Sequence, residues 1–148
     1  MRLTGLVLIL IFTGSSLFAK KIEDPQVLFV KKCAVCHKME RPKTKEQRKL
    51  MAAPAIKTVM AGSVITIDAL EGPMSEDELR AESIAFIKDY LFNPSKQKAN
   101  CEDFVVRKYG LMPSMKGFVS KEQVDILVPW VYDNFKPEKT KGSYKKQN

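Results

Sequence analysis

The feature that most constrains this chain is the pentapeptide Cys33-Ala34-Val35-Cys36-His37. Cys-x-x-Cys-His is the attachment signature of a c-type haem. On a helical turn, residues i and i+3 share a face and residue i+4 completes it. Both thiols can therefore form thioethers with the vinyl groups of one porphyrin, while the imidazole points at the iron from the same side. The pentapeptide predicts one covalently bound haem c, attached through Cys33 and Cys36 and ligated by His37.

Two other uses of these cysteines compete with haem attachment. A thioredoxin-type dithiol would use Cys33 and Cys36, but that motif requires a preceding strand and a βαβ context, and the residues before Cys33 favour a helix. A zinc site would add His37 and Cys101, but the adjacent ligands Cys36 and His37 fit one tetrahedron poorly. Haem attachment is therefore the favoured interpretation.

His37 is the only histidine of the chain. Bis-histidine ligation of an iron is therefore excluded, as is a His-rich zinc or copper site. Methionine is one of several further ligands that haem iron takes. Met112 is the best candidate, because it lies between the helix-breaking Gly110 and Pro113, which holds its backbone extended. Met115 in the same loop, or no methionine ligand, remains open.

The first 19 residues have the pattern of a secretory signal peptide. Arg2 supplies a positive charge, residues 6–12 form an unbroken apolar run, and small or polar residues follow before Ala19. The run is shorter than the roughly 20 apolar residues that span a bilayer, although an uncleaved anchor is the alternative. We expect removal of residues 1–19 and export to the periplasm. No later segment is long and apolar enough to cross a membrane, so stable membrane insertion after cleavage is not expected.

Helix signals dominate residues 20–135, which we expect to form one all-α domain of about four to five helices. Polar N-cap residues stand before four segments with apolar residues at helical spacing, at Asp24, Ser75, Asn100 and Ser120. Asn93-Pro94 should end the second of these helices and Gly110 the third. No sustained strand pattern and no internal repeat is present.

Three other segments are less regular. Residues 51–67 are apolar but broken by Pro54 and Gly62. Pro129 should kink the last helix, because proline removes one backbone hydrogen bond. Residues 136–148 are basic and polar, and we expect them to form a disordered tail.

Several of these features resemble the monohaem class I cytochrome c family, over about residues 24–135. The shared features are the attachment pentapeptide, an aromatic residue before it, a Pro-x-aliphatic segment after it, a Tyr-Leu-x-Asn-Pro helix end, a Met-Pro loop and a Leu/Trp pair. They stand at residues 33–37, Phe29, 54–56, 90–94, 112–113, and Leu127 with Trp130. The resemblance implies helices wrapped around one covalently bound haem, with Trp130 packed on Phe29.

The resemblance also implies roles for individual residues. The carbonyl of Pro54 would hold the His37 imidazole, the Tyr90 hydroxyl would approach the axial methionine, and Met112 would be that methionine. Plain core packing of Tyr90, with its hydroxyl at the surface, is the alternative.

The chain departs from this family at two segments that look like insertions, residues 38–53 and 95–111. The first is polar and basic, and its residues 38–50 form a loop or a short surface helix. The second holds Cys101, the cysteine left over from the pentapeptide. A small buried hydrophobe is the simplest use of that residue. An intermolecular disulfide dimer is the alternative, since an odd cysteine in an exported protein suggests it.

The predicted function is that of an electron carrier, which is not itself an enzyme. Two strong axial ligands, His37 and Met112, in an apolar pocket suit one-electron transfer. Alternatives are a ligand sensor or peroxidase-like protein with an open sixth position, and a fixed haem subunit of a respiratory complex. The chain has a net charge of +8. Basic residues near the pentapeptide either steer redox partners with acidic docking surfaces or form an ordinary solvated face: Lys31, Lys32, Lys38, Arg41, Lys43 and Lys45. Nucleic acid is not expected, because the basic residues are spread out without interleaved aromatics.

Overall fold

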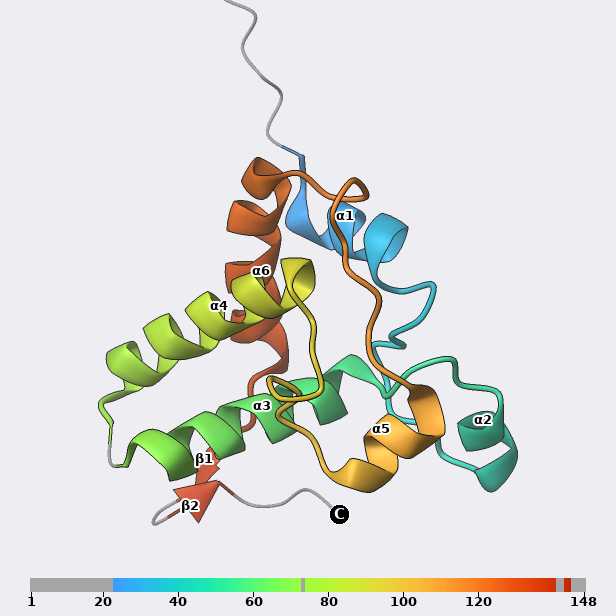
Figure 1. Cartoon of the computed structure of the whole chain (residues 1–148), viewed down its shortest axis with the longest axis horizontal. Coiled ribbons are helices and arrows are strands. Elements are labelled where there is room, and N and C mark those ends of the chain that lie inside the picture. The colour runs from blue at the N-terminus through green and yellow to red at the C-terminus, as the bar shows by residue number, and fades with distance from the viewer. Residues whose placement is uncertain (1–22, 73, 141–142, 145–148) are drawn as a thin grey trace, which may run out of the picture.

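The computed structural model describes residues 23–72, 74–140 and 143–144. Over these residues the chain forms six helices and one small antiparallel hairpin (Figure 1). The elements are α1 (Pro25–Lys32), α2 (Lys45–Lys49), α3 (Ile56–Glu71), α4 (Glu76–Phe92), α5 (Asp103–Tyr109), α6 (Lys121–Phe135), β1 (Lys139–Thr140) and β2 (Ser143–Tyr144). The expected all-α architecture is confirmed in outline. The predicted signal peptide, residues 1–19, lies outside the described residues.

Three helices begin where their capping residues predict. The Asp24 carboxylate accepts the backbone N–H of Gln26 at 2.8 Å and starts α1, with Pro25 at the first helical position. Ser75 and Ser120 each form a reciprocal capping box with the residue three positions later. The predicted end of α4 at Asn93 is also confirmed.

The structure corrects two helix boundaries. α5 is capped at Glu102 rather than at Asn100, because a tight turn, in which the Cys101 N–H donates to the Ala99 carbonyl at 2.8 Å, holds Asn100 outside the helix. α3 runs unbroken through Gly62. A side chain there would meet the Asn100 carbonyl oxygen at 3.5 Å, so this glycine lies where the later loop crosses the helix closely.

Two further segments are more ordered than expected. Thr44 and Gln47 form a capping box that starts α2 within the basic segment, which brings the helix count of the described residues above the expected four to five. In the tail, β1 pairs with β2, so the expectation of a wholly disordered tail is wrong for those residues. Strands of two residues are too short to show an alternating pattern in the sequence.

The core lies where α6 packs against α1, α3 and α4. Its buried side chains come from all four helices: Leu28, Phe29, Ile56, Met60, Val64, Ile67, Leu79, Leu127, Val131 and Tyr132. The rings of Phe29 and Trp130 lie 5.8 Å apart, which confirms their predicted contact. α6 remains one helix through Pro129. None of the helices in the described part of the chain is both long and apolar enough to span a membrane.

Candidate haem-binding site

The attachment pentapeptide stands at the end of α1, in a turn that follows the regular helix. Cys33 is the C-cap of α1, and its N–H donates to the Phe29 carbonyl at 2.8 Å. The His37 N–H donates to the Cys33 carbonyl at 2.9 Å, which closes one further helical turn. Neither thiol is in a disulfide, and Cys33 is half-buried while Cys36 is exposed. The helical spacing that haem attachment needs is therefore kept, although α1 itself ends one residue before the pentapeptide.

The His37 ring is oriented by a backbone carbonyl. Its Nδ1 lies 2.8 Å from the Pro54 oxygen. Because a carbonyl can only accept a hydrogen bond, Nδ1 carries the proton and Nε2 keeps a free lone pair. Burial lowers the pKa of His37, against the opposing effect of the Pro54 carbonyl, so the ring is neutral at pH 7. Metal-ligating histidines have this arrangement, with one nitrogen fixed and the other free.

The segment of residues 38–53 separates His37 from Pro54 in sequence, but its two ends are joined in the fold. The Ile56 N–H donates to the Lys38 carbonyl at 2.9 Å, beside the bond between His37 and Pro54. Lys57 and Glu40 add an ion pair at 3.2 Å. The residues between these ends leave the body of the molecule as an arm that carries α2, at the lower right of Figure 1. The joined ends keep Pro54 beside the imidazole although a long segment lies between them.

The two competing uses of the cysteines find no support in this geometry. No cluster of three or more His, Cys, Asp or Glu side chains is placed to hold a metal ion within the described ranges, which include Cys101. Burial, with a smaller contribution from Cys36, raises the pKa of Cys33 to about 11. A redox-active dithiol needs a readily formed thiolate, and the element before Cys33 is a helix rather than a strand.

Packing separates the methionines into two groups. Met60 is buried in the main core, and three others pack against a core cluster: Met39, Met74 and Met115. Met51 and Met112 are half-buried and lie outside both clusters. Met112 lies on an irregular segment that starts at Gly110, which has a φ of +75°. The Met112 side chain therefore packs in neither core cluster, whereas the Met115 side chain packs against one.

The loop that carries Met112 is attached to the last turn of α4. The Ser114 hydroxyl donates to the Phe92 carbonyl at 2.8 Å, and the Met115 N–H donates to the Leu91 carbonyl at 2.8 Å. Lys116 adds a bond from its ammonium to the Asn93 side-chain oxygen at 2.9 Å. The bonds from Ser114 and Met115 satisfy carbonyls that a helix end leaves unpaired. Sequence reasoning missed Ser114 and Lys116, since only the fold brings them to α4.

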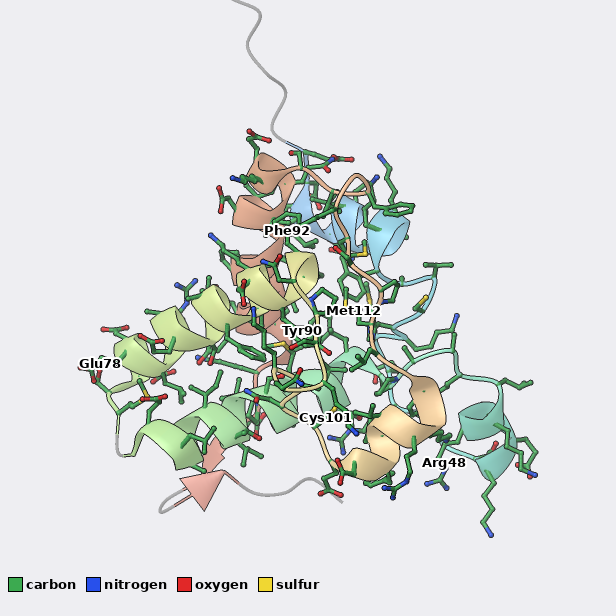
Figure 2. All side chains as sticks on the ribbon, in the orientation of Figure 1. Arg48, Glu78, Tyr90, Phe92, Cys101 and Met112 are labelled. Atoms are coloured by element: carbon green, nitrogen blue, oxygen red, sulfur yellow. The ribbon has the colours of Figure 1, made fainter. Side chains whose placement is uncertain are left out.

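Tyr90 is half-buried on the same part of α4. Its ring stacks on Phe86 with centroids 5.8 Å apart. Burial raises the pKa of Tyr90, with a smaller contribution from Cys101, so its hydroxyl remains protonated and able to donate. Figure 2 shows the labelled side chains of Tyr90, Met112 and Cys101 in the middle of the molecule. The predicted approach of the hydroxyl to the axial methionine stays a prediction.

Cys101 is exposed, so the expectation of a small buried hydrophobe is wrong. The turn at Ala99 leaves the residue at the surface before α5 begins. Burial of part of the side chain and the charge of Asp103 raise the pKa of Cys101, which lowers the thiolate fraction. The intermolecular disulfide stays a prediction.

Comparison with known proteins gives one informative match. No family model matches the chain, and no solved structure matches it. An "Uncharacterized protein" of Aquifex aeolicus (strain VF5) is 33% identical over 117 residues, which cover 74% of this chain and 72% of the relative. The chain therefore belongs to the same protein family as this Aquifex aeolicus protein.

Proposed function

We propose that the protein is a periplasmic electron carrier with one haem c, attached to Cys33 and Cys36 and ligated by His37 and Met112. The observation that carries the proposal is the bond between His37 Nδ1 and the Pro54 oxygen, at 2.8 Å, next to two thiols that form no disulfide. It leaves Nε2 of a neutral imidazole as a ligand one turn from the first cysteine. A thioredoxin-type dithiol would not require this tethering.

The residues present fit a c-type haem. When bound, the haem supplies a one-electron iron couple. Cys33 and Cys36 would hold the group covalently, and the carbonyl of Pro54 keeps the His37 ring in one orientation. The thioether of Met112 would favour the ferrous state and raise the reduction potential. The core behind α1 excludes water from that side, since Leu28 and Phe29 are fully buried.

The charge distribution supports a redox partner with an acidic docking surface. Residues 38–50, which begin directly after His37, contain six basic and two acidic residues, a net +4. Residues 68–82 contain six acidic residues and one basic residue, a net −5. Figure 2 shows Arg48 of the first segment and Glu78 of the second at opposite ends of the molecule. An acidic partner would be steered toward the end that carries α2.

The absorption spectrum of protein matured in a periplasm with haem c maturation tests the proposal. We expect a low-spin ferric spectrum with the weak long-wavelength methionine–iron band, and no immediate change on adding carbon monoxide to the ferrous protein. A high-spin spectrum that shifts at once with carbon monoxide or cyanide would favour a sensor or peroxidase-like protein. Stable co-purification with larger subunits would favour a fixed haem subunit.

A further inference from the structure

Lys32 joins α1, the helix that leads into the pentapeptide, to the loop that carries Met112. It is the last residue of α1 and directly precedes Cys33. Its ammonium donates to the backbone carbonyl of Phe118 at 2.6 Å, across 86 residues of sequence. Lys32 is half-buried as a residue, and its charged end reaches the carbonyl.

The carbonyl that accepts this bond is presented by a tight turn. The Phe118 N–H donates to the Met115 carbonyl at 3.0 Å and the Val119 N–H to the same carbonyl at 3.2 Å. Gly117 has a φ of +83°, a conformation that glycine adopts without strain. Met115 is bonded to α4 and packs against the Val119 cluster. The turn is built on the Met115 carbonyl, three residues after Met112, so the turn and Met112 belong to one short stretch of chain.

We propose that Lys32 is a positioning residue for the sixth iron ligand, because its bond fixes the loop that carries Met112 relative to α1. This inference rests on the proposed function. Hydrogen bonds hold His37 to the end of α1 and to Pro54. Other hydrogen bonds hold the loop that carries Met112 to the end of α4. The Lys32 bond is a direct link between these two sides. Its loss should leave the loop on α4 but allow Met112 to leave the iron more often.

The expected effect is moderate. One hydrogen bond from a charged donor at a partly exposed position changes an equilibrium by about fivefold. An external ligand that needs the methionine-free form binds in proportion to the population of that form. The apparent affinity of the ferric protein for imidazole should therefore rise by about fivefold when the Lys32 bond is removed.

The experiment is an imidazole titration of the ferric protein, followed by the methionine–iron band, in three variants. Lys32→Met keeps the apolar stem and removes the donor. Lys31→Met is the matched control, since it removes the same charge one residue earlier, from a surface ion pair with Glu23 at 3.0 Å. Lys32→Arg keeps a donor. We expect a fivefold rise for Lys32→Met, and values within about twofold of the wild type for the other two, because a surface ion pair contributes little.

The outcomes separate this inference from the function on which it rests. If the wild type shows the methionine–iron band and Lys32→Met binds imidazole as the wild type does, the positioning role is wrong and the electron carrier stands. Equal increases in Lys31→Met and Lys32→Met would also overturn the role, since charge alone would then explain them. A wild type without haem would overturn both proposals. Reduced haem loading does not obscure the comparison, because the affinity is measured on the loaded molecules.

Discussion

The two sides of the candidate haem site are built in different ways. On the histidine side, Cys33, Cys36 and His37 lie within five residues, and one backbone carbonyl, that of Pro54, orients the ring. On the methionine side, Met112 lies in a loop that is held by its neighbours, through bonds to the end of α4 and to Lys32. The first side is local in sequence, whereas the second is assembled from segments far apart.

This difference predicts how amino-acid substitutions act on each side of the site. Contacts on the histidine side include a backbone carbonyl that no side-chain substitution removes. Contacts on the methionine side include single side chains, such as Ser114, Lys116 and Lys32. We therefore expect loss of the cysteines to abolish haem attachment completely. Single substitutions on the methionine side should weaken the ligation by methionine in steps.

The largest expected effect is the loss of both attachment cysteines. Cys33→Ser combined with Cys36→Ser should abolish covalent haem, because no other thiol lies in the turn that carries His37. Haem staining of the denatured protein after electrophoresis measures this. Cys101→Ser is the control and should retain full staining, since Cys101 lies on the segment before α5. Staining that persists in the double variant would show that the histidine side is misassigned.

The next effect concerns the methionine side alone. Met112→Ala should remove the methionine–iron band while the haem stays attached, because the thioether is replaced by a methyl group. Met51→Ala, which changes a second methionine outside both core clusters, should keep the band. Met115→Ala should keep the band but lower the free energy of unfolding by about 2 kcal/mol, as a partly buried methionine would. If Met115→Ala alone loses the low-spin state, the ligand assignment is wrong.

The packing of α1 against α6 supports both sides of the site. Substitutions in this packing should change the free energy of unfolding rather than the ligation of the iron. Phe29 is fully buried and its ring lies 5.8 Å from Trp130 and 5.7 Å from Phe135. Phe29→Ala should lower the free energy of unfolding by about 3–5 kcal/mol, measured by urea denaturation. Val30→Ala on the same helix should cost under about 0.5 kcal/mol, because Val30 is 53% exposed. Equal losses in the two variants would contradict the core as described.

The smallest effect is on acid stability near the methionine side. Hydrogen bonds from Lys98 and then Asn93 lower the pKa of Asp89 below its ordinary value of 3.8, and Asn93 also accepts Lys116. Because the folded pKa is the lower one, the stabilisation is complete above about pH 4 and is lost as the pH falls through the folded value. Urea midpoints between pH 7 and pH 3 measure the loss.

Asp89→Asn is the control for that titration. This variant should show a smaller fall in the urea midpoint at acid pH than the wild type. The difference in midpoint between the two should shrink at high salt, since the ion pair of Asp89 and Lys98 is exposed. A decline that is identical in Asp89→Asn and the wild type would show that this carboxylate does not hold the end of α4.

Local signals predicted much of the fold. The starts of α1, α4 and α6 follow from Asp24, Ser75 and Ser120, because a capping side chain acts within three residues of itself. The pentapeptide and the candidate methionine were likewise found from short-range patterns. The contact between Phe29 and Trp130 required the family resemblance, since nothing local in either helix specifies its partner.

What the sequence could not show depends on tertiary contacts. Asn100 has the chemistry of an N-cap but is held in a turn, and Gly62 has the chemistry of a helix breaker but lies inside α3. In the sequence, Lys32 looks like any other surface lysine, because its contact with the Phe118 carbonyl depends on the fold. The exposure of Cys101 likewise follows from the path of the chain before α5 rather than from residue type.

Haem attachment at the pentapeptide is tested by the intact mass of the matured wild-type protein under denaturing conditions, after treatment with a thiol-alkylating reagent. We expect a chain that carries one haem and in which neither Cys33 nor Cys36 is alkylated, whatever the state of Cys101. A colourless chain in which both of these thiols react, after export in a host that matures c-type haem proteins, would contradict it.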